Sequence, residues 1–288
     1  MKNTEKKDED LVEIVQPLVN WYRKNKRDLP WRHNPDAYRV WISEIMLQQT
    51  RVEAVKGYYD RFLKALPTVK DLAEAEEDKL LKLWEGLGYY NRVRNMQKAA
   101  QQIMVDHEGI FPDTYEEILQ LKGIGNYTAG AISAFAYGIP KPAVDGNVLR
   151  VISRITGSYE DIMKQSVRKK IENALEQVIP SDAASDFNQG LIELGAIVCV
   201  PNGEPKCEVC PVKEYCIACT ENLTAEIPVK KKAKARKIEE RTILIFKDGK
   251  RIAIRKRPAK GLLAGLYEFP NVEGKLSMDE VTEYSKTI

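Results

Sequence analysis

The chain of 288 residues has no apolar segment that approaches the length needed to span a membrane. Its start, MKNTEKKDEDLVEIV, has no apolar run followed by a small-residue cleavage site, so we expect no signal peptide. It also has no large excess of charge of one sign, since 45 lysines and arginines face 42 aspartates and glutamates. These absences predict a soluble protein of the cytoplasm. The net charge of +3 permits nucleic-acid binding without arguing for it.

Cysteine is absent outside one short stretch, because all five cysteines fall between Cys199 and Cys219. A disulfide framework would distribute pairs through a small secreted domain. Four of the five have the spacing C-x7-C-x2-C-x5-C, which indicates tetrahedral zinc or an iron–sulfur cluster and does not decide between them. We interpret Cys219 as a bystander thiol. The candidate metal ligands are Cys199, Cys207, Cys210 and Cys216.

Strictly alternating β-type runs are scarce over residues 8–225, where apolar residues recur at three- and four-residue spacing and predict helices. Residues 242–255 differ, because they read as two strands joined by a tight turn at Asp248-Gly249. The basic stretch VKKKAKARK between these regions is interpreted as a linker. The expected domains are a helical domain at 1–228, the linker at 229–237 and a small, short α/β domain at 238–288.

A helical hairpin is predicted around residue 123. Thr114 and Glu117 form a capping-box pattern, and Gly138 is placed to end a second helix that begins at residue 126. Between these helices, Gly123 and Gly125 allow a tight turn whose N–H groups could face a phosphate oxygen. On the glycine pair alone, a helical corner without a ligand is equally consistent.

Two carboxylates lie in opposite settings. Three of the four nearest helix neighbours of Glu44 are apolar, and such desolvation would raise its pKa toward that of a general acid. Asp145 precedes a helix that Asn147 could cap, and a helix N-terminus favours an ionised Asp. Cleavage of a glycosidic bond needs this division of labour. Periodicity alone fits a surface Glu and a turn Asp at least as well.

Several motifs occur together in order: WISEIMLQQT, GLGYYNRVRN, LKGIGNYTAG and VDGNVLRV. Over roughly residues 10–270 the chain resembles MutY-type adenine DNA glycosylases, members of the endonuclease III or helix-hairpin-helix superfamily. The resemblance implies a mainly α, two-lobed fold with the DNA cleft and base pocket between the lobes. It implies a six-helix lobe at about 31–138 and a cluster lobe formed by 8–30 and 139–228.

The resemblance also implies roles for individual residues. In that family the glutamate matching Glu44 protonates adenine, and the aspartate matching Asp145 stabilises the oxocarbenium sugar. Asn147 would orient this pair, and Tyr127 would lie at the reacting sugar. Trp31 would be a flat wall for a flipped purine, although a lone Trp is more often a core residue. The expected adenine-contacting residues are Arg27, Leu29, Trp31, Arg32, Leu47, Val52 and Gln189.

The implied partner is double-stranded DNA that contains adenine mispaired with 8-oxoguanine or guanine. Gln49 and Tyr89 match residues that enter the base stack where adenine leaves, and Lys122, Gly123 and Gly125 match the turn that grips the DNA backbone. We expect the chain to act as a monomer, without membrane attachment, in a bacterial-type cytoplasm with the nucleoid.

The superfamily holds a 4Fe-4S cluster on cysteines that match the four ligands above. The first gap is one residue longer here, which we interpret as an insertion in VPNGEPK. Residues 254–274 resemble the Nudix-like domain with which the family reads 8-oxoguanine. The acidic box of Nudix hydrolases is missing, and so are the later family residues that reach the oxidised guanine.

Three alternatives remain. The first is a bifunctional pyrimidine glycosylase of endonuclease III type, but such enzymes carry a lysine nucleophile where this chain has Tyr127 and lack the glutamate at Glu44. The second is a non-enzymatic DNA-binding protein that uses the same hairpin. The third is a zinc-stabilised module without a role on DNA.

Overall fold

The helix that carries Glu44 is at the centre of the fold. The computed structural model describes residues 11–231, 238–258 and 261–287. In α3 (Ala37–Leu47), nine of eleven residues are buried, as expected for a helix that is apolar on nearly all sides. Asp36 starts the helix, because its side chain accepts a hydrogen bond from the Arg39 N–H at 2.8 Å.

The chain divides by its contacts into two units, Met1–Lys231 and Lys232–Ile288. The first unit is helical and contains two separate hydrophobic cores. The first core is built by residues 29–132 and includes Trp41, Phe62 and Trp84. The elements around it are η1 (Pro30–Arg32), α3, α4 (Val52–Ala65), α5 (Val69–Ala73), α6 (Glu77–Leu83), α7 (Asn91–Asp106), α8 (Tyr115–Gln120) and α9 (Asn126–Tyr137).

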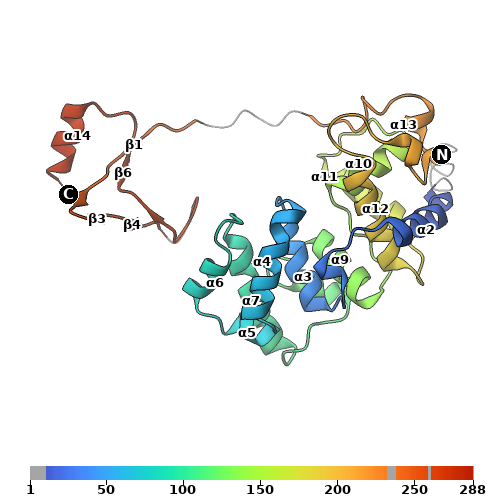
Figure 1. Ribbon diagram of the computed structural model, residues 1–288, viewed down its shortest axis with the longest axis horizontal. Helices are drawn as coiled ribbons and strands as arrows, with labels where there is room; N and C mark the ends of the chain where they lie inside the picture. Colours follow the sequence, from blue (N-terminus) through green and yellow to red (C-terminus); the bar gives the residue numbers. More distant parts are fainter. Residues whose placement is uncertain (1–10, 232–237, 259–260, 288) are drawn as a thin grey trace. The chain divides into compact units, whose positions relative to one another are not determined.

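The second core joins both ends of the helical unit. Figure 1 shows α2, near the N-terminus, beside α12, although the two are far apart in the sequence. Leu18 of α2 and Phe187 of α12 are both fully buried in this core. Its elements are α2 (Val15–Asn25), α10 (Gly146–Ile155), α11 (Gln165–Glu176), α12 (Ala184–Ile197), η2 (Cys207–Val209), η3 (Lys213–Tyr215) and α13 (Ile217–Thr220).

The predicted helical hairpin is formed by α8 and α9. Gly138 ends α9 in a left-handed conformation, as expected. Gly123 is needed for two reasons, since its φ is +81° and a Cβ there would lie 2.7 Å from the Asn95 Cβ. The cap differs in detail from the prediction. The Thr114 hydroxyl accepts from the Glu117 N–H, but the Glu117 carboxylate bonds the hydroxyl of Thr114.

In its described residues, 238–258 and 261–287, the second unit has three two-stranded antiparallel ladders and α14 (Met278–Ser285). The predicted hairpin is present, but its turn is Gly249-Lys250, one residue later than expected, because Asp248 pairs with Arg251. The Ala253 N–H extends this hairpin by donating to the Phe246 carbonyl, whereas the ends of the predicted runs pair with other strands. The ladders are β1 (Arg241–Ile243) with β6 (Asn271–Glu273), β2 (Lys247–Asp248) with β3 (Arg251–Ile252), and β4 (Arg255–Lys256) with β5 (Tyr267–Glu268).

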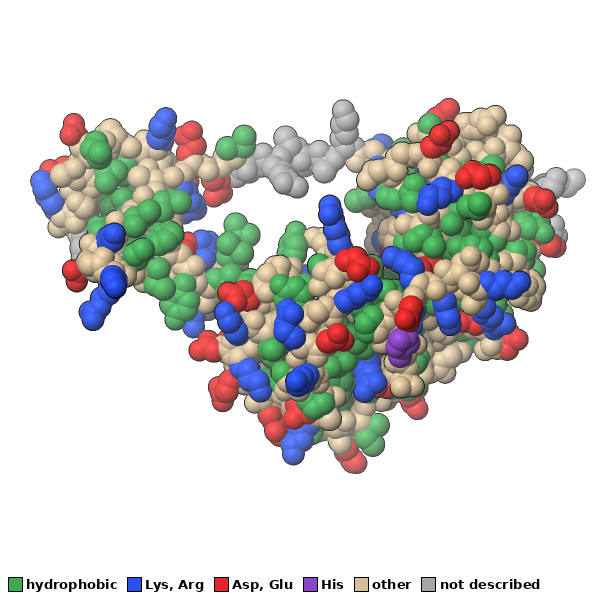
Figure 2. Space-filling model, viewed as in Figure 1, with side chains coloured by type: hydrophobic (Ala, Val, Ile, Leu, Met, Phe, Trp, Pro, Cys, Tyr) green, Lys and Arg blue, Asp and Glu red, His purple; other side chains and the backbone are tan. Residues whose placement is uncertain are grey.

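Apolar side chains gather on the visible face of this second unit, as Figure 2 shows. The strand residues Ile243 and Ile252 are 60% and 48% exposed, so the ladders bury little of their apolar surface. Of the predicted linker, the structure describes only Val229 to Lys231, and these pack on the helical unit, since the Ile162 N–H donates to the Val229 carbonyl. Residues 232–237 lie outside the described chain. None of the described helices is long and apolar enough to cross a membrane.

Close packing of α9 against the chain that leads to α10 gives a stability prediction. A Cβ on Gly130 would lie 2.0 Å from the Pro142 carbonyl oxygen, so Gly130→Ala must displace backbone. We expect a loss of about 1–3 kcal/mol in the free energy of unfolding, measured with urea. Gly57→Ala is the control, because its Cβ would meet only the flexible end of Arg61 at 3.3 Å. Equal stability of the two variants would contradict the prediction.

Candidate active site

A cavity of about 640 Å³ lies where the two cores of the helical unit meet. Its lining comes from the chain before α3, from α3 and α4, from α9 and the start of α10, and from α11 and α12. All four predicted catalytic residues and all seven predicted adenine-contacting residues line it, together with Gln49. These residues are Arg27, Leu29, Trp31, Arg32, Glu44, Leu47, Gln49, Val52, Tyr127, Asp145, Asn147 and Gln189.

Glu44 is 6% exposed and faces this cavity from α3. Its Oε2 accepts a hydrogen bond of 2.5 Å from the hydroxyl of Tyr127 on α9. Burial raises the pKa of Glu44 to about 7, against the Tyr127 hydrogen bond, and Asp145 contributes to the rise. Burial also holds the pKa of Tyr127 well above its ordinary value, so that the phenol remains a donor at neutral pH.

Asp145 is the N-cap of α10, so the expectation that Asn147 caps this helix was wrong. Its Oδ1 accepts from the N–H groups of Asn147 and Val148, each at 2.8 Å, and its Oδ2 accepts from the Asn147 side chain at 2.7 Å. Burial nevertheless raises the pKa of Asp145 above its ordinary value, although these hydrogen bonds lower it. From the sequence we expected the helix N-terminus to favour the ionised form of Asp145, and that expectation left out the opposing effect of burial on its pKa.

One wall of the cavity is a network around Glu193, whose side chain has no exposed surface. Its carboxylate accepts from Arg27 Nε at 2.7 Å and Arg27 Nη2 at 2.9 Å, and from Arg32 Nη2 at 2.8 Å. Burial raises the pKa of Glu193, but the hydrogen bonds from both arginines outweigh it and lower the pKa to about 2. Arg32 also bonds Gln189 Oε1 at 3.1 Å, so this wall is cationic and fixed in position.

A second wall of the cavity is apolar and is formed by Leu29, Trp31, Leu47 and Val52. Trp31 is 7% exposed and packs edge-on against Tyr59, with ring centroids 5.6 Å apart. It is both a core residue and a cavity residue. The two readings of a lone Trp in the sequence therefore do not exclude one another.

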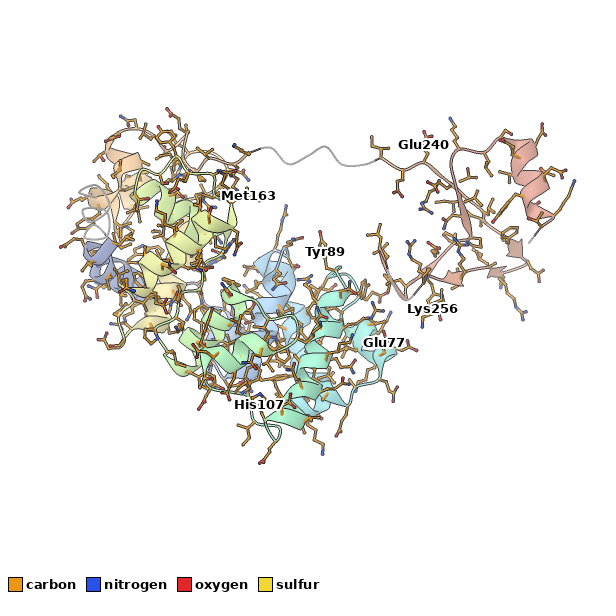
Figure 3. The ribbon with its side chains drawn as sticks, turned by 180° about the vertical axis from the view of Figure 1, so that it is seen from behind. Glu77, Tyr89, His107, Met163, Glu240 and Lys256 are labelled. Atoms are coloured by element: carbon orange, nitrogen blue, oxygen red, sulfur yellow. The ribbon has the colours of Figure 1, made fainter. Side chains whose placement is uncertain are left out.

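The predicted DNA-contacting residues lie at the rim of the cavity or outside it. Gln49 lines the cavity, whereas Tyr89 is 66% exposed and projects from the loop between α6 and α7 (Figure 3). Both have left-handed backbones, with φ of +60° and +48°. Lys122, Gly123 and Gly125 are exposed in the turn between α8 and α9.

Two buried arginines of α10 connect the cavity to the cysteines. Arg150 donates to Asn147 Oδ1 at 2.9 Å and to the Cys199 carbonyl at 2.8 Å. Arg154 donates to the Cys199 Sγ at 3.2 Å. The helix that begins at Asp145 is thus fixed to the first cysteine through its side chains.

All five cysteines line one small void beside α10. Cys219 lines it as well, although the sequence suggested a bystander. Among the described residues, no three His, Cys, Asp or Glu side chains form a group that could hold a metal ion. The thiols are thus gathered around one space without forming a compact site for a single ion.

Comparisons with known proteins agree with this geometry. Residues 42–178 match the model of the HhH-GPD superfamily of base excision DNA repair proteins. The adenine DNA glycosylase of Buchnera aphidicola from Acyrthosiphon pisum is 40% identical over 90% of this chain and 74% of its own length. The chain belongs to the adenine DNA glycosylase family. The human member is 35% identical over 91% of this chain, which spans 58% of that protein's length.

Solved structures of other DNA glycosylases have the same fold as the helical unit of this chain. A thermostable thymine-DNA glycosylase matches with a TM-score of 0.66 and 30% identity, over 76% of this chain and 99% of its own. A non-covalent endonuclease III–DNA complex matches with a TM-score of 0.63 and 22% identity, over 75% of this chain and 98% of its own. The expectation of a mainly helical, endonuclease III-like fold is confirmed.

Two charged residues of the cavity lining were not predicted as site residues. Glu193 lies in an apolar helix, as Glu44 does, and four residues after Gln189, so both side chains are on the same face of α12. This spacing could have predicted from the sequence that Glu193 lines the cavity. Arg168 of α11 lines the cavity and donates to the Val144 carbonyl next to Asp145. Nothing in the periodicity of α11 indicates this contact.

The raised pKa of Glu44 predicts a pH-dependent stability. Well below its ordinary pKa of 4.5, the carboxyl is protonated in both the folded and the unfolded chain and has no effect. As the pH rises from 4.5 to about 7, only the unfolded chain releases the proton, so the folded state loses stability. The loss should reach about 3 kcal/mol and stay constant at higher pH.

Glu44→Gln removes this titration with little change of shape. We expect the variant to gain stability on the parent chain as the pH rises through this interval, by up to about 3 kcal/mol in urea unfolding. Glu74→Gln is the control, because Glu74 is exposed and paired only with Lys70 at 3.8 Å. A Glu44→Gln difference that does not vary with pH would show that the buried carboxyl is not the cause.

Proposed function

We propose that this chain is a monofunctional adenine DNA glycosylase of base-excision repair. It flips adenine out of a duplex and hydrolyses the N-glycosidic bond. One observation carries the proposal: Glu44, which is buried, and Asp145, which is half-buried, face one cavity from different lobes. Chemistry on a base requires the base outside the stack, and hydrolysis of the bond requires an acid at the base and a negative charge at the sugar.

Glu44 is the general acid in this proposal. Its pKa of about 7 leaves a substantial fraction protonated at neutral pH, when a proton must pass to the leaving adenine. The Tyr127 hydroxyl fixes the carboxyl in place through Oε2 and leaves Oε1 available to the base. Proton transfer makes neutral adenine the leaving group, so the glycosidic bond breaks with less charge on the purine.

Asp145 stabilises the positive charge that develops on the sugar. Asn147 orients it with two hydrogen bonds, one from the backbone and one from the side chain. Because α10 points its N-terminus at the same carboxylate, charge is stabilised there without rearrangement during the reaction.

The two walls of the cavity suit a purine. Trp31 and Leu29 offer an apolar face for the ring, while Arg32 and Gln189 offer hydrogen-bonding groups for its edge. Gln49 and Tyr89 enter the stack in place of the flipped base, and the turn at Lys122, Gly123 and Gly125 binds a phosphate through its N–H groups.

The absence of an amine supports hydrolysis without strand cleavage. No lysine of the described chain lines the cavity, and the position of the endonuclease III nucleophile is occupied by Tyr127, which bonds Glu44. A Schiff base, and the β-elimination that follows from it, would therefore lack its nucleophile.

The four cysteines Cys199, Cys207, Cys210 and Cys216 suit a 4Fe-4S cluster. These cysteines line one void beside α10, and four thiolates would be the ligand set for such a cluster. A bound cluster would order the loop that follows α12.

The second unit is proposed to be Nudix-like and to favour 8-oxoguanine opposite the target adenine. The enzyme is proposed to bind duplex DNA as a monomer. These proposals rest on the family resemblance of residues 254–274 and on the DNA complexes among the structures of the same fold.

The deciding experiment measures adenine release from duplexes with A opposite 8-oxoguanine and A opposite G, with and without alkali. We expect strand breaks only after alkali and no borohydride-trapped adduct. Breaks without alkali, or a trapped adduct, would support the pyrimidine-type lyase instead. No release by the folded protein from either duplex would reject the proposal.

The roles of the two carboxylates are tested separately. Glu44→Gln and Asp145→Asn should each reduce single-turnover adenine release by at least about 100-fold, while binding to the same duplex persists. Glu74→Gln should behave as the parent chain does. Unchanged release by Glu44→Gln, with contaminating activity excluded by a mock purification, would reject Glu44 as the general acid.

The metal is tested on the purified protein by its colour, visible absorption and iron, sulfide and zinc content. We expect a brown protein with iron and sulfide, and loss of both in Cys210→Ser. Stoichiometric zinc without iron would establish the zinc alternative.

A further inference from the structure

The loop residues proposed to enter the DNA stack are held by one arginine that no motif assigns a role. Arg92 lies in the first turn of α7 and donates to four main-chain carbonyls. Its Nη1 bonds the carbonyls of Ile45 and Gln48, each at 2.7 Å. Its Nη2 bonds those of Leu87 at 3.0 Å and Gly88 at 3.3 Å.

The first pair of carbonyls lies at the end of α3. A helix C-terminus leaves its last carbonyls without partners and carries partial negative charge, so a guanidinium there is well placed. The residue that follows Gln48 is Gln49, whose φ is +60°. Arg92 therefore fixes the backbone directly before Gln49, whose left-handed conformation is rare for an L-amino acid other than glycine.

The second pair of carbonyls precedes Tyr89, whose φ is +48°. The Gly88 carbonyl also accepts from the Trp84 Nε1 at 3.0 Å. The Arg92 guanidinium stacks between two rings, 5.3 Å from the centre of Trp84 and 5.7 Å from that of Tyr89. One cation thus connects the two strained turns to each other and to the core of the lobe.

Resting on the proposed function, we propose that Arg92 is the positioning residue for base flipping, which sets the separation of Gln49 and Tyr89. Two left-handed residues on separate loops relax independently unless something joins them. With Arg92 in place, both side chains are presented together at the site where the flipped base would leave a gap. Arg92 acts through these two residues and does not line the cavity itself.

The proposal predicts a defect in flipping rather than in chemistry. Arg92→Met should reduce single-turnover adenine release from a fully paired A:8-oxoguanine duplex by roughly 10- to 100-fold. The loss should shrink severalfold on a duplex with a mismatched pair beside the target, because less unstacking is needed there. The fluorescence of 2-aminopurine next to the target should rise less than with the parent chain.

Conservative and matched variants complete the test. Arg92→Lys keeps the charge but not the fork that reaches four carbonyls, so it should recover only part of the activity. Lys98→Met is the control, since it removes an exposed charge from the same helix. In the background of Gln49→Ala with Tyr89→Ala, Arg92→Met should add little further loss.

Several outcomes would overturn the proposal. Equal losses on the stacked and the mismatched duplex would place the effect in folding or chemistry, as would full additivity with the Gln49 and Tyr89 variants. Unchanged release by Arg92→Met would also reject it. If Arg92→Met does not fold, the ratio between duplexes for Arg92→Lys decides, and an unchanged ratio rejects the proposal. A parent chain that releases no adenine rejects the proposed function instead.

Discussion

The burial of the Glu44 carboxyl is the constraint on which the rest of the site depends. α3 is packed on nearly every side, so the carboxyl loses water and its pKa rises to about 7. Its hydrogen-bond partner comes from α9, and the second carboxylate comes from α10. α3 and α9 belong mainly to one core and α10 to the other. The cavity therefore requires both lobes, and neither could form the site by itself.

Glu193 shows that an apolar helix does not by itself decide the charge of a buried glutamate. Like Glu44, it is buried within a helix of mainly apolar residues. The difference lies in the donors, because two arginines bond Glu193 and lower its pKa to about 2, while a single phenol bonds Glu44. The same cavity thus has one carboxyl poised to carry a proton and one that is permanently ionised. The ionised one holds Arg27 and Arg32 in place.

Close backbone packing and arginine side chains hold the carboxyl groups of the cavity in fixed positions, although these groups come from two different cores. A Cβ on Gly195 of α12 would lie 2.5 Å from the Asn147 Cβ, so α12 is pressed against the segment that orients Asp145. Arg150 and Arg154 then fix α10 to the loop of Cys199. On the other side of the cavity, Arg92 fixes the end of α3 to the loop of Tyr89. Each of these arginines donates to main-chain carbonyls, which determines the backbone position without any need for a carboxylate.

The amino-acid sequence was enough to predict the helical class, the hairpin around Gly123, the family and twelve of the residues that line the cavity. It could do so because periodicity, capping and ordered motifs are local properties of the chain. It missed the exact turn at Gly249-Lys250, because strand register depends on which strands pair. Three features could be seen only in the folded chain: burial raises the pKa of Asp145, Arg168 lines the cavity, and two arginines keep Glu193 ionised. The physical reason is common to all three: desolvation and charge pairing depend on groups from distant segments, and the sequence around each residue does not contain them.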